Sequence, residues 1–178
     1  MADFKKCNTF DSSKNDYYTQ KIYWEKIAHL IPKDKIIYEA FLLNSKSKSI
    51  DYLKELGFDN VVGHDKLDFL NHDLPKYDLI VSNPPFETKT KTQILQKLCD
   101  LNKPFIIVIN ISCIFAKYFR DIFKNQIHDL QIIKPNGRIG FEEYNQNTDK
   151  LDKCKMPAFY NCYLAYKMNI PEQQLWLK

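Results

Sequence analysis

Apolar residues along this chain occur in two patterns, short continuous runs and longer stretches with helical spacing. The continuous runs are rich in β-branched residues, which predicts buried strands at residues 35–43, 61–64, 77–81 and 104–112. The spaced stretches carry apolar side chains three and four positions apart, which predicts helices at residues 16–31, 50–57, 89–101 and 111–123. Strand and helix therefore alternate, and this order predicts a doubly wound α/β fold with a mostly parallel sheet.

The elements beyond residue 123 are shorter. Strands are predicted at residues 130–133 and 138–141, and the turn sequence Pro135-Asn136-Gly137 lies between them. The polar segment 145–157 predicts a loop. Residues 159–168 alternate between apolar and polar and predict a last strand, which we expect to pair with 138–141 as an antiparallel edge of the sheet.

Length and composition favour one globular domain. The chain has 178 residues, of which 44% are hydrophobic and 27% are charged, and this is enough for a proper core. We expect a single domain over residues 1–178, with a loosely ordered tail at 1–14. No apolar run follows Met1 as in a leader peptide, and none approaches the length that crosses a membrane. We therefore expect a soluble protein with no membrane association.

Charge and cysteine content narrow the range of partners. The net charge of +4 permits nucleic acid as a partner. Arg120 and Arg138 are the two arginines, so most positive charge is lysine, which suits phosphate contacts better than base readout. The five cysteines are odd in number and form no CxxC, which argues against a zinc site and against a disulfide framework. We expect no bound metal.

The sequence YDLIVSNPPF at residues 77–86 carries the most specific chemistry. Pro84 and Pro85 cannot continue the strand, because each lacks a backbone donor and has a fixed φ angle. They therefore hold the Asn83 amide and the Phe86 ring at the carboxyl end of a strand, where α/β sheets bind ligands. An amide oxygen and a proline carbonyl can accept the two hydrogens of an exocyclic amine, and an aromatic ring can stack on a base.

This proline turn resembles motif IV of the S-adenosylmethionine-dependent amino-methyltransferases, which include the N6-adenine DNA methyltransferases. The resemblance to small viral or phage-type members covers residues 17 to about 168, including the segments YYT, EAF, LGF, DFL, KPFIIVI and RIGF. It implies a Rossmann-like class I methyltransferase fold and S-adenosylmethionine as the cofactor. It also implies that Asn83, Pro84, Pro85 and Phe86 are the catalytic residues.

The resemblance further implies residues for the methionine end of the cofactor. Thr19 matches motif X, which helps to hold the methionine moiety, although Gln20 replaces the usual proline. In the family the first strand ends in an acidic residue, which Glu39 matches, and Glu39 would accept from the cofactor ammonium directly or through water. Phe41 matches the opening of the turn that follows in the family. Residues 42–49 depart from the family pattern, because they contain no glycine where the backbone should approach the cofactor closely. This departure leaves open a reduced affinity for the cofactor or a catalytically inactive copy.

The adenosine end of the cofactor would lie beyond the second predicted strand. His64 or Asp65 occupies the position that commonly bonds the ribose, and Asp65 is preferred because a carboxylate can accept from both hydroxyls. The resemblance implies that Asp68 accepts from the adenine amino group and that Phe69 offers a ring face or packs in the core.

Two basic residues are candidates for binding the substrate. Lys89 lies at the start of a predicted helix beside the proline turn, where it opposes the helix dipole unless a negative group such as a phosphate is near. Arg138 precedes Phe141 near the end of the sheet and could contact a substrate phosphate. A solvated lysine and a structural ion pair are the competing interpretations.

These features together predict an enzyme that transfers a methyl group to the N6 amine of adenine in DNA. Amines of adenine or guanine in RNA, and glutamine side chains, remain open as substrates. A catalytically weakened subunit that binds nucleic acid or a partner methyltransferase is a second hypothesis, because no segment is large enough for a target-recognition domain. A homodimer could also supply the missing recognition elements. A nucleotide-binding oxidoreductase is disfavoured because GxGxxG is absent. We expect a cytoplasmic location, or the host cell interior if the protein is viral.

Overall fold

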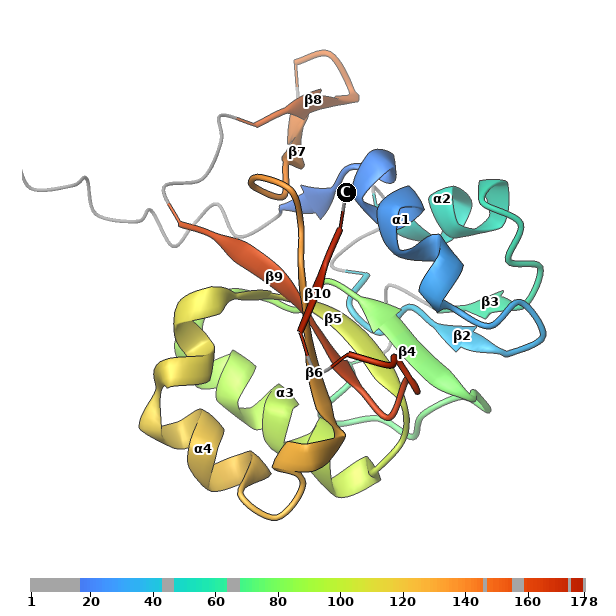
Figure 1. Cartoon of the computed structure of the whole chain (residues 1–178). Coiled ribbons are helices and arrows are strands. Elements are labelled where there is room, and N and C mark those ends of the chain that lie inside the picture. Colours follow the sequence, from blue (N-terminus) through green and yellow to red (C-terminus); the bar gives the residue numbers. More distant parts are fainter. Residues whose placement is uncertain are drawn as a thin grey trace, which may run out of the picture.

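A computed structural model describes most of the chain (Figure 1). The described residues are 17–42, 47–63, 68–145, 147–154, 159–172 and 174–177. The predicted ribose contacts His64 and Asp65, the predicted tail at 1–14 and half of the glycine-free loop lie outside them.

The described residues form one large sheet with the strand order β10-β6-β9-β5-β4-β2-β3. Its strands are β2 (Ile37–Tyr38), β3 (Val61–Val62), β4 (Leu79–Ser82), β5 (Phe105–Asn110), β6 (Leu130–Lys134), β9 (Asn161–Tyr166) and β10 (Gln174–Trp176). All neighbouring strands are parallel except β9, which is antiparallel to both β5 and β6. The predicted Rossmann-like α/β fold with a mostly parallel sheet is therefore confirmed.

The predicted antiparallel strand forms, but two details of its placement were wrong. Strand β9 lies inside the sheet, and β10 takes the edge. The partners of β9 are β5 and β6 and not residues 138–141. The physical reason is burial, because all six residues of β9 are buried and its backbone needs a neighbour on each side.

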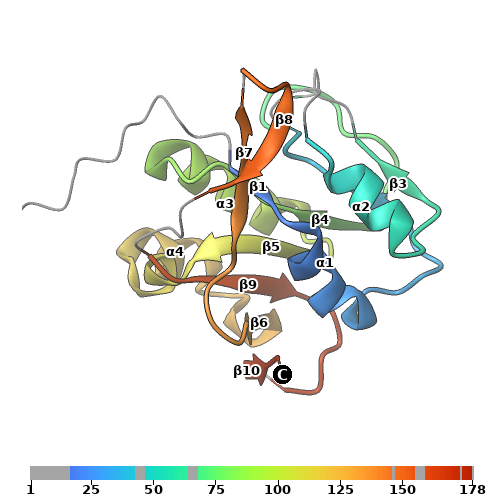
Figure 2. The ribbon, with the colours of Figure 1, turned by 90° about the horizontal axis from the view of Figure 1, so that it is seen from above.

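A second sheet of the described residues has the order β1-β7-β8. It is formed by β1 (Tyr18–Thr19), β7 (Phe141–Asn145) and β8 (Lys150–Lys153). Figure 2 shows the β7–β8 hairpin running crosswise to β5 and β9. The sequence predicted a loop over 145–157, and this was wrong for β8. Asp149 accounts for the tight turn, since it adopts a positive φ of 53° just before β8 begins.

Helices cover both faces of the large sheet (Figure 1). They are α1 (Lys21–Ile27), α2 (Ser49–Glu55), α3 (Thr88–Leu101) and α4 (Lys117–Phe123), with short 3-10 helices at η1 (Ala28–Leu30), η2 (Ile111–Phe115) and η3 (Ile127–Asp129). Residues Ile80 and Leu164 pack into the layer beneath α3 and α4. Their strand neighbours Val81 and Tyr163 pack into the layer beneath α1 and α2. This alternation explains why the strands read as continuous apolar runs. None of the helices in the described ranges has the length and hydrophobicity that crossing a membrane requires.

The strand order also fixes where a ligand can bind. From β2 the chain first pairs β3 on one side, and it then returns to place β4 on the other side of β2. The direction of winding therefore reverses between β2 and β4. In open α/β sheets, ligands bind beside the carboxyl ends of the strands at such a reversal. Glu39 follows β2 and Asn83 follows β4, so both lie at this position.

Candidate active site

The proline turn has the stiff geometry that its sequence predicts. Strand β4 is buried throughout and ends at Ser82. Helix α3 begins beyond the two prolines, where the Glu87 carboxylate caps it by accepting from Thr90 N at 2.6 Å and Lys89 N at 2.8 Å. These backbone hydrogen bonds from Thr90 and Lys89 hold the pKa of Glu87 at about 2. The turn is therefore anchored by a buried strand before it and a capped helix after it.

The Asn83 side chain is fixed in one orientation. Its Nδ2 donates to the backbone oxygen of Tyr17 at 2.9 Å. A carbonyl oxygen can only accept, so the nitrogen must face Tyr17 and the amide oxygen must face away from it. That oxygen, Oδ1, is buried and has no hydrogen-bond partner among the described residues. The turn thus presents one oriented acceptor to which no described group of the protein donates.

Phe86 lies in a group of four aromatic rings, Tyr17, Phe86, Phe141 and Phe159, which we call the aromatic group. The Phe86 ring centroid is 5.6 Å from those of Phe141 and Phe159, and 6.3 Å from that of Tyr17. Its contacts with Tyr17 and Phe141 are edge-on, at interplanar angles of 69° and 80°. Rings from distant parts of the chain therefore fix Phe86, which is half-buried, beside Asn83.

Glu39 is a buried carboxyl group with one oxygen satisfied and one not. The residue is 2% exposed. Its Oε1 accepts from the Ser82 hydroxyl and, at 3.2 Å, from Phe41 N. Its Oε2 is buried and makes no hydrogen bond of ordinary geometry in the described part of the chain, although the Ser49 side chain is near enough to lower the pKa of the carboxyl group. Burial raises the pKa of Glu39 to about 7, against the opposing effect of its hydrogen bonds. A cation that reached Oε2 would stabilise the ionised form.

Gly63 allows the backbone to come close to Glu39. A Cβ atom added at Gly63 would lie 2.6 Å from the Glu39 carbonyl oxygen, a distance that real Cβ atoms essentially never show. Any other residue would therefore displace the end of β2. The family pattern predicts a glycine within residues 42–49, whereas the structure places the tight approach at Gly63, directly after β3.

Thr19 supplies a third buried oxygen without a partner. The residue is 4% exposed, and its hydroxyl has no hydrogen bond among the described residues. Thr19 lies in β1 and pairs with Phe141. It does not cap the following helix, because Gln20 precedes α1 and no side chain caps that helix. Tyr17, two residues earlier, binds Asn83, so Thr19 is held close to the proline turn.

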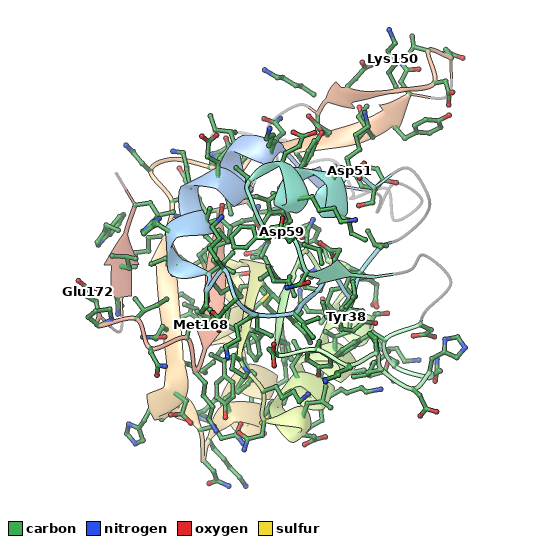
Figure 3. The ribbon with its side chains drawn as sticks, turned by 90° about the vertical axis from the view of Figure 1, so that its right-hand side faces the viewer. Tyr38, Asp51, Asp59, Lys150, Met168 and Glu172 are labelled. Carbon is green, nitrogen blue, oxygen red and sulfur yellow. The ribbon has the colours of Figure 1, made fainter. Side chains whose placement is uncertain are left out.

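A hydrogen bond from α2 anchors the small sheet that carries Thr19. The Tyr52 hydroxyl donates to Glu142 Oε2 at 3.1 Å. Burial raises the pKa of Glu142. A cleft of about 430 Å³ lies between α2 and the hairpin, and Lys48 and Lys150 are among its lining residues. Figure 3 shows Lys150 at the outer end of the hairpin and Asp51 on α2 below it. Charges of both signs line this cleft, so it favours no single class of ligand.

The predicted adenosine contacts have structural partners of their own. Asp68 is exposed and accepts from Leu70 N at 2.8 Å and from the Asn71 side chain, and these bonds lower the pKa of Asp68. Phe69 is buried, with its ring 5.1 Å from that of the half-buried Phe41. Asp68 thus stabilises a local turn, and Phe69 and Phe41 pack together. Their contacts with a cofactor stay predictions.

The two basic residues predicted to bind substrate differ in their surroundings. Lys89 is exposed in the first turn of α3. The buried neighbour Lys91 instead supports the proline turn, since its Nζ donates to Phe86 O at 3.2 Å. The Arg138 guanidinium lies 4.7 Å from the ring centroid of Tyr160. Substrate binding by Lys89 and Arg138 stays a prediction.

The structure therefore joins Thr19, Glu39 and Asn83 through a short series of contacts. Tyr17 binds Asn83, Asn83 follows Ser82, and Ser82 binds Glu39. Sequence reasoning missed Ser82, Gly63 and the role of Tyr17, because each acts on a residue far away in the chain. Within the described ranges, no group of three or more His, Cys, Asp and Glu side chains could hold a metal ion.

Comparison with known proteins gives matches to solved structures alone. No family model and no curated protein matches the chain. A dimethyladenosine transferase from Plasmodium falciparum is 13% identical with a TM-score of 0.46, over 84% of this chain and 61% of that one. A SAM-dependent O-methyltransferase from Thermotoga maritima is 10% identical with a TM-score of 0.40, over 82% and 64%. The S. pombe Dnmt2 methyltransferase is 14% identical with a TM-score of 0.39, over 86% and 48%.

The chain spans less than two thirds of the length of each of these three structures. Each TM-score is below 0.5, so the function of this protein is inferred from the geometry of its site and not from these likenesses.

Proposed function

We propose that this protein is an S-adenosylmethionine-dependent methyltransferase that acts on an exocyclic amine, with the N6 amine of adenine in DNA as its first candidate substrate. The observation that carries the proposal is the Asn83 amide. Its nitrogen is held by Tyr17 O, and its buried oxygen has no partner among the described residues. A buried acceptor without a donor costs stability, and a substrate N–H would satisfy it.

The proline turn can make such an amine reactive. The lone pair of an amine on a heteroaromatic ring is delocalised into the ring, so the nitrogen is a poor nucleophile. Asn83 Oδ1 and a proline carbonyl would accept its two hydrogens and favour the pyramidal nitrogen that attacks. Because Tyr17 fixes the orientation of the Asn83 amide, Oδ1 would position and polarise the amine once the substrate is bound. Phe86, held by the other aromatic rings, would stack on the face of the base.

The orphaned oxygens of Glu39 and Thr19 fit the cofactor. S-adenosylmethionine, when bound, supplies an electrophilic methyl group on a sulfonium and carries an ammonium group. Glu39 Oε2 would accept from that ammonium. This hydrogen bond would replace the contacts with water that the carboxylate loses by being buried. Ser82 would hold the Glu39 carboxylate in place, and the Thr19 hydroxyl would bind the methionine moiety. Gly63 keeps the end of β2 in the position that this requires.

Charge and atoms balance in the proposed transfer. The cofactor would supply the methyl group, so one carbon–sulfur bond would break as one carbon–nitrogen bond forms, and the cofactor would leave as a neutral thioether. The resulting ammonium is acidic, so it loses its proton to water. No general base is needed before attack, which agrees with an Asn at this position and not a stronger base.

Transfer of a radiolabelled methyl group tests the proposal. The substrates are a DNA oligonucleotide, an RNA oligonucleotide and free nucleosides, each with S-adenosylmethionine. We expect labelling of adenine in DNA by the wild-type protein and a loss of at least about 100-fold in Asn83→Ala. The matched control is Asn125→Ala, an exposed asparagine after α4, which should keep wild-type activity. Labelling of RNA but not DNA would move the substrate class to RNA, and no labelling of any amine would refute the proposal.

A further inference from the structure

Asn161, the first residue of β9, has an unusual environment for a buried polar residue. It is 3% exposed. Both of its side-chain polar atoms, Nδ2 and Oδ1, lack a hydrogen-bond partner among the described residues. Buried amides are normally hydrogen-bonded, because leaving both groups unpaired lowers stability. Neither the proposed cofactor contacts nor the proposed activation of the amine uses this side chain.

The sheet places Asn161 on the same edge as Asn83. Strand β9 is antiparallel to β5, and Asn161 pairs with Asn110, the last residue of β5. Strand β5 in turn is parallel to β4, with Ser82 opposite Ile107. Asn161 therefore lies at the carboxyl edge of the sheet, one strand beyond β5 as seen from Asn83.

The face of the sheet is also the same as that of the aromatic group. Side chains alternate along β9, so Asn161 shares a face with Tyr163 and Ala165. Both of these pack in the hydrophobic layer that contains Phe141 and against which Phe86 packs. Phe159, two residues before Asn161, contacts the Phe86 ring at 5.6 Å. The Asn161 amide thus lies beside the aromatic group, near Phe159.

We propose that Asn161 binds the hydrogen-bonding edge of a planar heterocyclic amine, and so restricts the substrate to a nucleobase. This inference rests on the proposed function and deepens it. The amide nitrogen of Asn161 is a donor, and the edges of adenine offer acceptor ring nitrogens beside the amine. Nδ2 would donate to one of these ring nitrogens, while both amine hydrogens stay with Asn83 Oδ1 and the proline carbonyl.

An alkyl amine, or a ring with carbon in place of that nitrogen, cannot satisfy the Asn161 amide. Sites built around a buried hydrogen bond reject analogues that leave it unmade. Asn161 would therefore determine specificity, whereas Asn83 acts on the reacting amine.

The test compares oligonucleotides that contain adenine, 1-deazaadenine or 7-deazaadenine, each of which keeps the exocyclic amine. We expect the wild-type protein to prefer adenine over one of the two analogues by about ten-fold or more in kcat/KM. In Asn161→Leu, kcat/KM on adenine should fall by about ten-fold and that preference should disappear. The Kd for S-adenosylmethionine should not change, and Tm should stay the same or rise, because Leu removes two unpaired polar groups.

The outcomes separate the inference from the proposed function. If Asn161→Leu keeps the wild-type ratio between adenine and both analogues, Asn161 does not contact the base and the inference is overturned. If Asn161→Leu does not fold, the same ratio is measured with Asn161→Ala, with the melting curve as evidence of folding. A wild-type protein that methylates none of the oligonucleotides would overturn the proposed function, and the role of Asn161 with it. Exposed Asn125→Leu serves as the matched control, with wild-type ratios expected.

Discussion

Replacing Glu39 by glutamine tests the electrostatics of the site without assuming any activity. Glu39 is buried, and burial raises its pKa from the usual 4.5 to about 7. Gln has nearly the same shape and can still accept from Ser82 and Phe41 through its oxygen. It remains neutral at every pH, so it resembles the protonated form of Glu39.

The pKa values fix the direction and size of the effect. Between pH 4.5 and 7 the folded protein binds the Glu39 proton and the unfolded chain releases it, so stability falls as pH rises. The stability that the protonated Glu39 contributes to the folded state is fully present below pH 4.5 and is lost as pH rises through 7. The difference between these two pKa values corresponds to about 3 kcal/mol in the free energy of unfolding. The free energy of unfolding of Glu39→Gln, relative to that of the wild-type protein, should therefore increase by about 3 kcal/mol as the pH is raised from about 4 to about 8.

Urea unfolding across this pH range measures the gain directly. Fluorescence of the fully buried Trp24 reports the transition. The control is Glu25→Gln in α1, which removes an exposed carboxylate in place of a buried one. The reasoning is refuted if the difference in free energy of unfolding between the wild-type protein and Glu39→Gln stays constant from pH 4 to pH 8. It is also refuted if Glu39→Gln is the less stable of the two proteins at pH 8.

The same variant links stability to the proposed function. We expect Glu39→Gln to bind S-adenosylmethionine at least about ten-fold more weakly, because a neutral amide cannot balance the cofactor ammonium. The wild-type affinity should also fall as pH is lowered through 7, since Glu39 becomes protonated. Isothermal titration on either side of this pKa measures both effects. Greater stability with weaker binding is the pattern expected of a group that is retained for function.

Two further variants test the proline turn and the close approach to Glu39. In Asn83→Ala, the rate of methyl transfer should fall by at least about 100-fold, because the lost acceptor contacts the amine. The Kd for S-adenosylmethionine should stay unchanged, and a parallel loss of cofactor affinity would contradict this role. In Gly63→Ala, the new Cβ would lie 2.6 Å from the Glu39 carbonyl oxygen. The free energy of unfolding should therefore drop by about 1–3 kcal/mol, and cofactor affinity should fall with it. Unchanged urea unfolding would show that β2 has room to move.

Local sequence pattern was enough to predict several elements of the fold. The strand at 77–81 and the helix at 89–101 form close to their predicted ranges, as β4 and α3, because their apolar spacing is set by the layers they contact. The position of β9 was not predictable in the same way. Its six buried residues are compatible with any inner place in the sheet, and its pairing with β5 and β6 depends on segments far away in the chain.

The residues of the candidate site also differ in whether local sequence reveals them. Asn83 and Glu39 could be recognised in the sequence, because a proline turn and an acidic strand end are local features. The roles of Tyr17, Ser82 and Gly63 could not, since each depends on a contact between distant segments, namely Tyr17 with Asn83 and both Ser82 and Gly63 with Glu39. Asn161 is evident only after its burial and its missing partners are known.

Methyl transfer to adenine can be observed directly by mass spectrometry of the base after an oligonucleotide is incubated with the wild-type protein and S-adenosylmethionine. We expect adenine that is heavier by one methyl group at N6, formed by the wild-type protein and not by Asn83→Ala. Adenine that stays unmodified while the protein binds the cofactor, or equal product from Asn83→Ala, would contradict the role proposed for the proline turn.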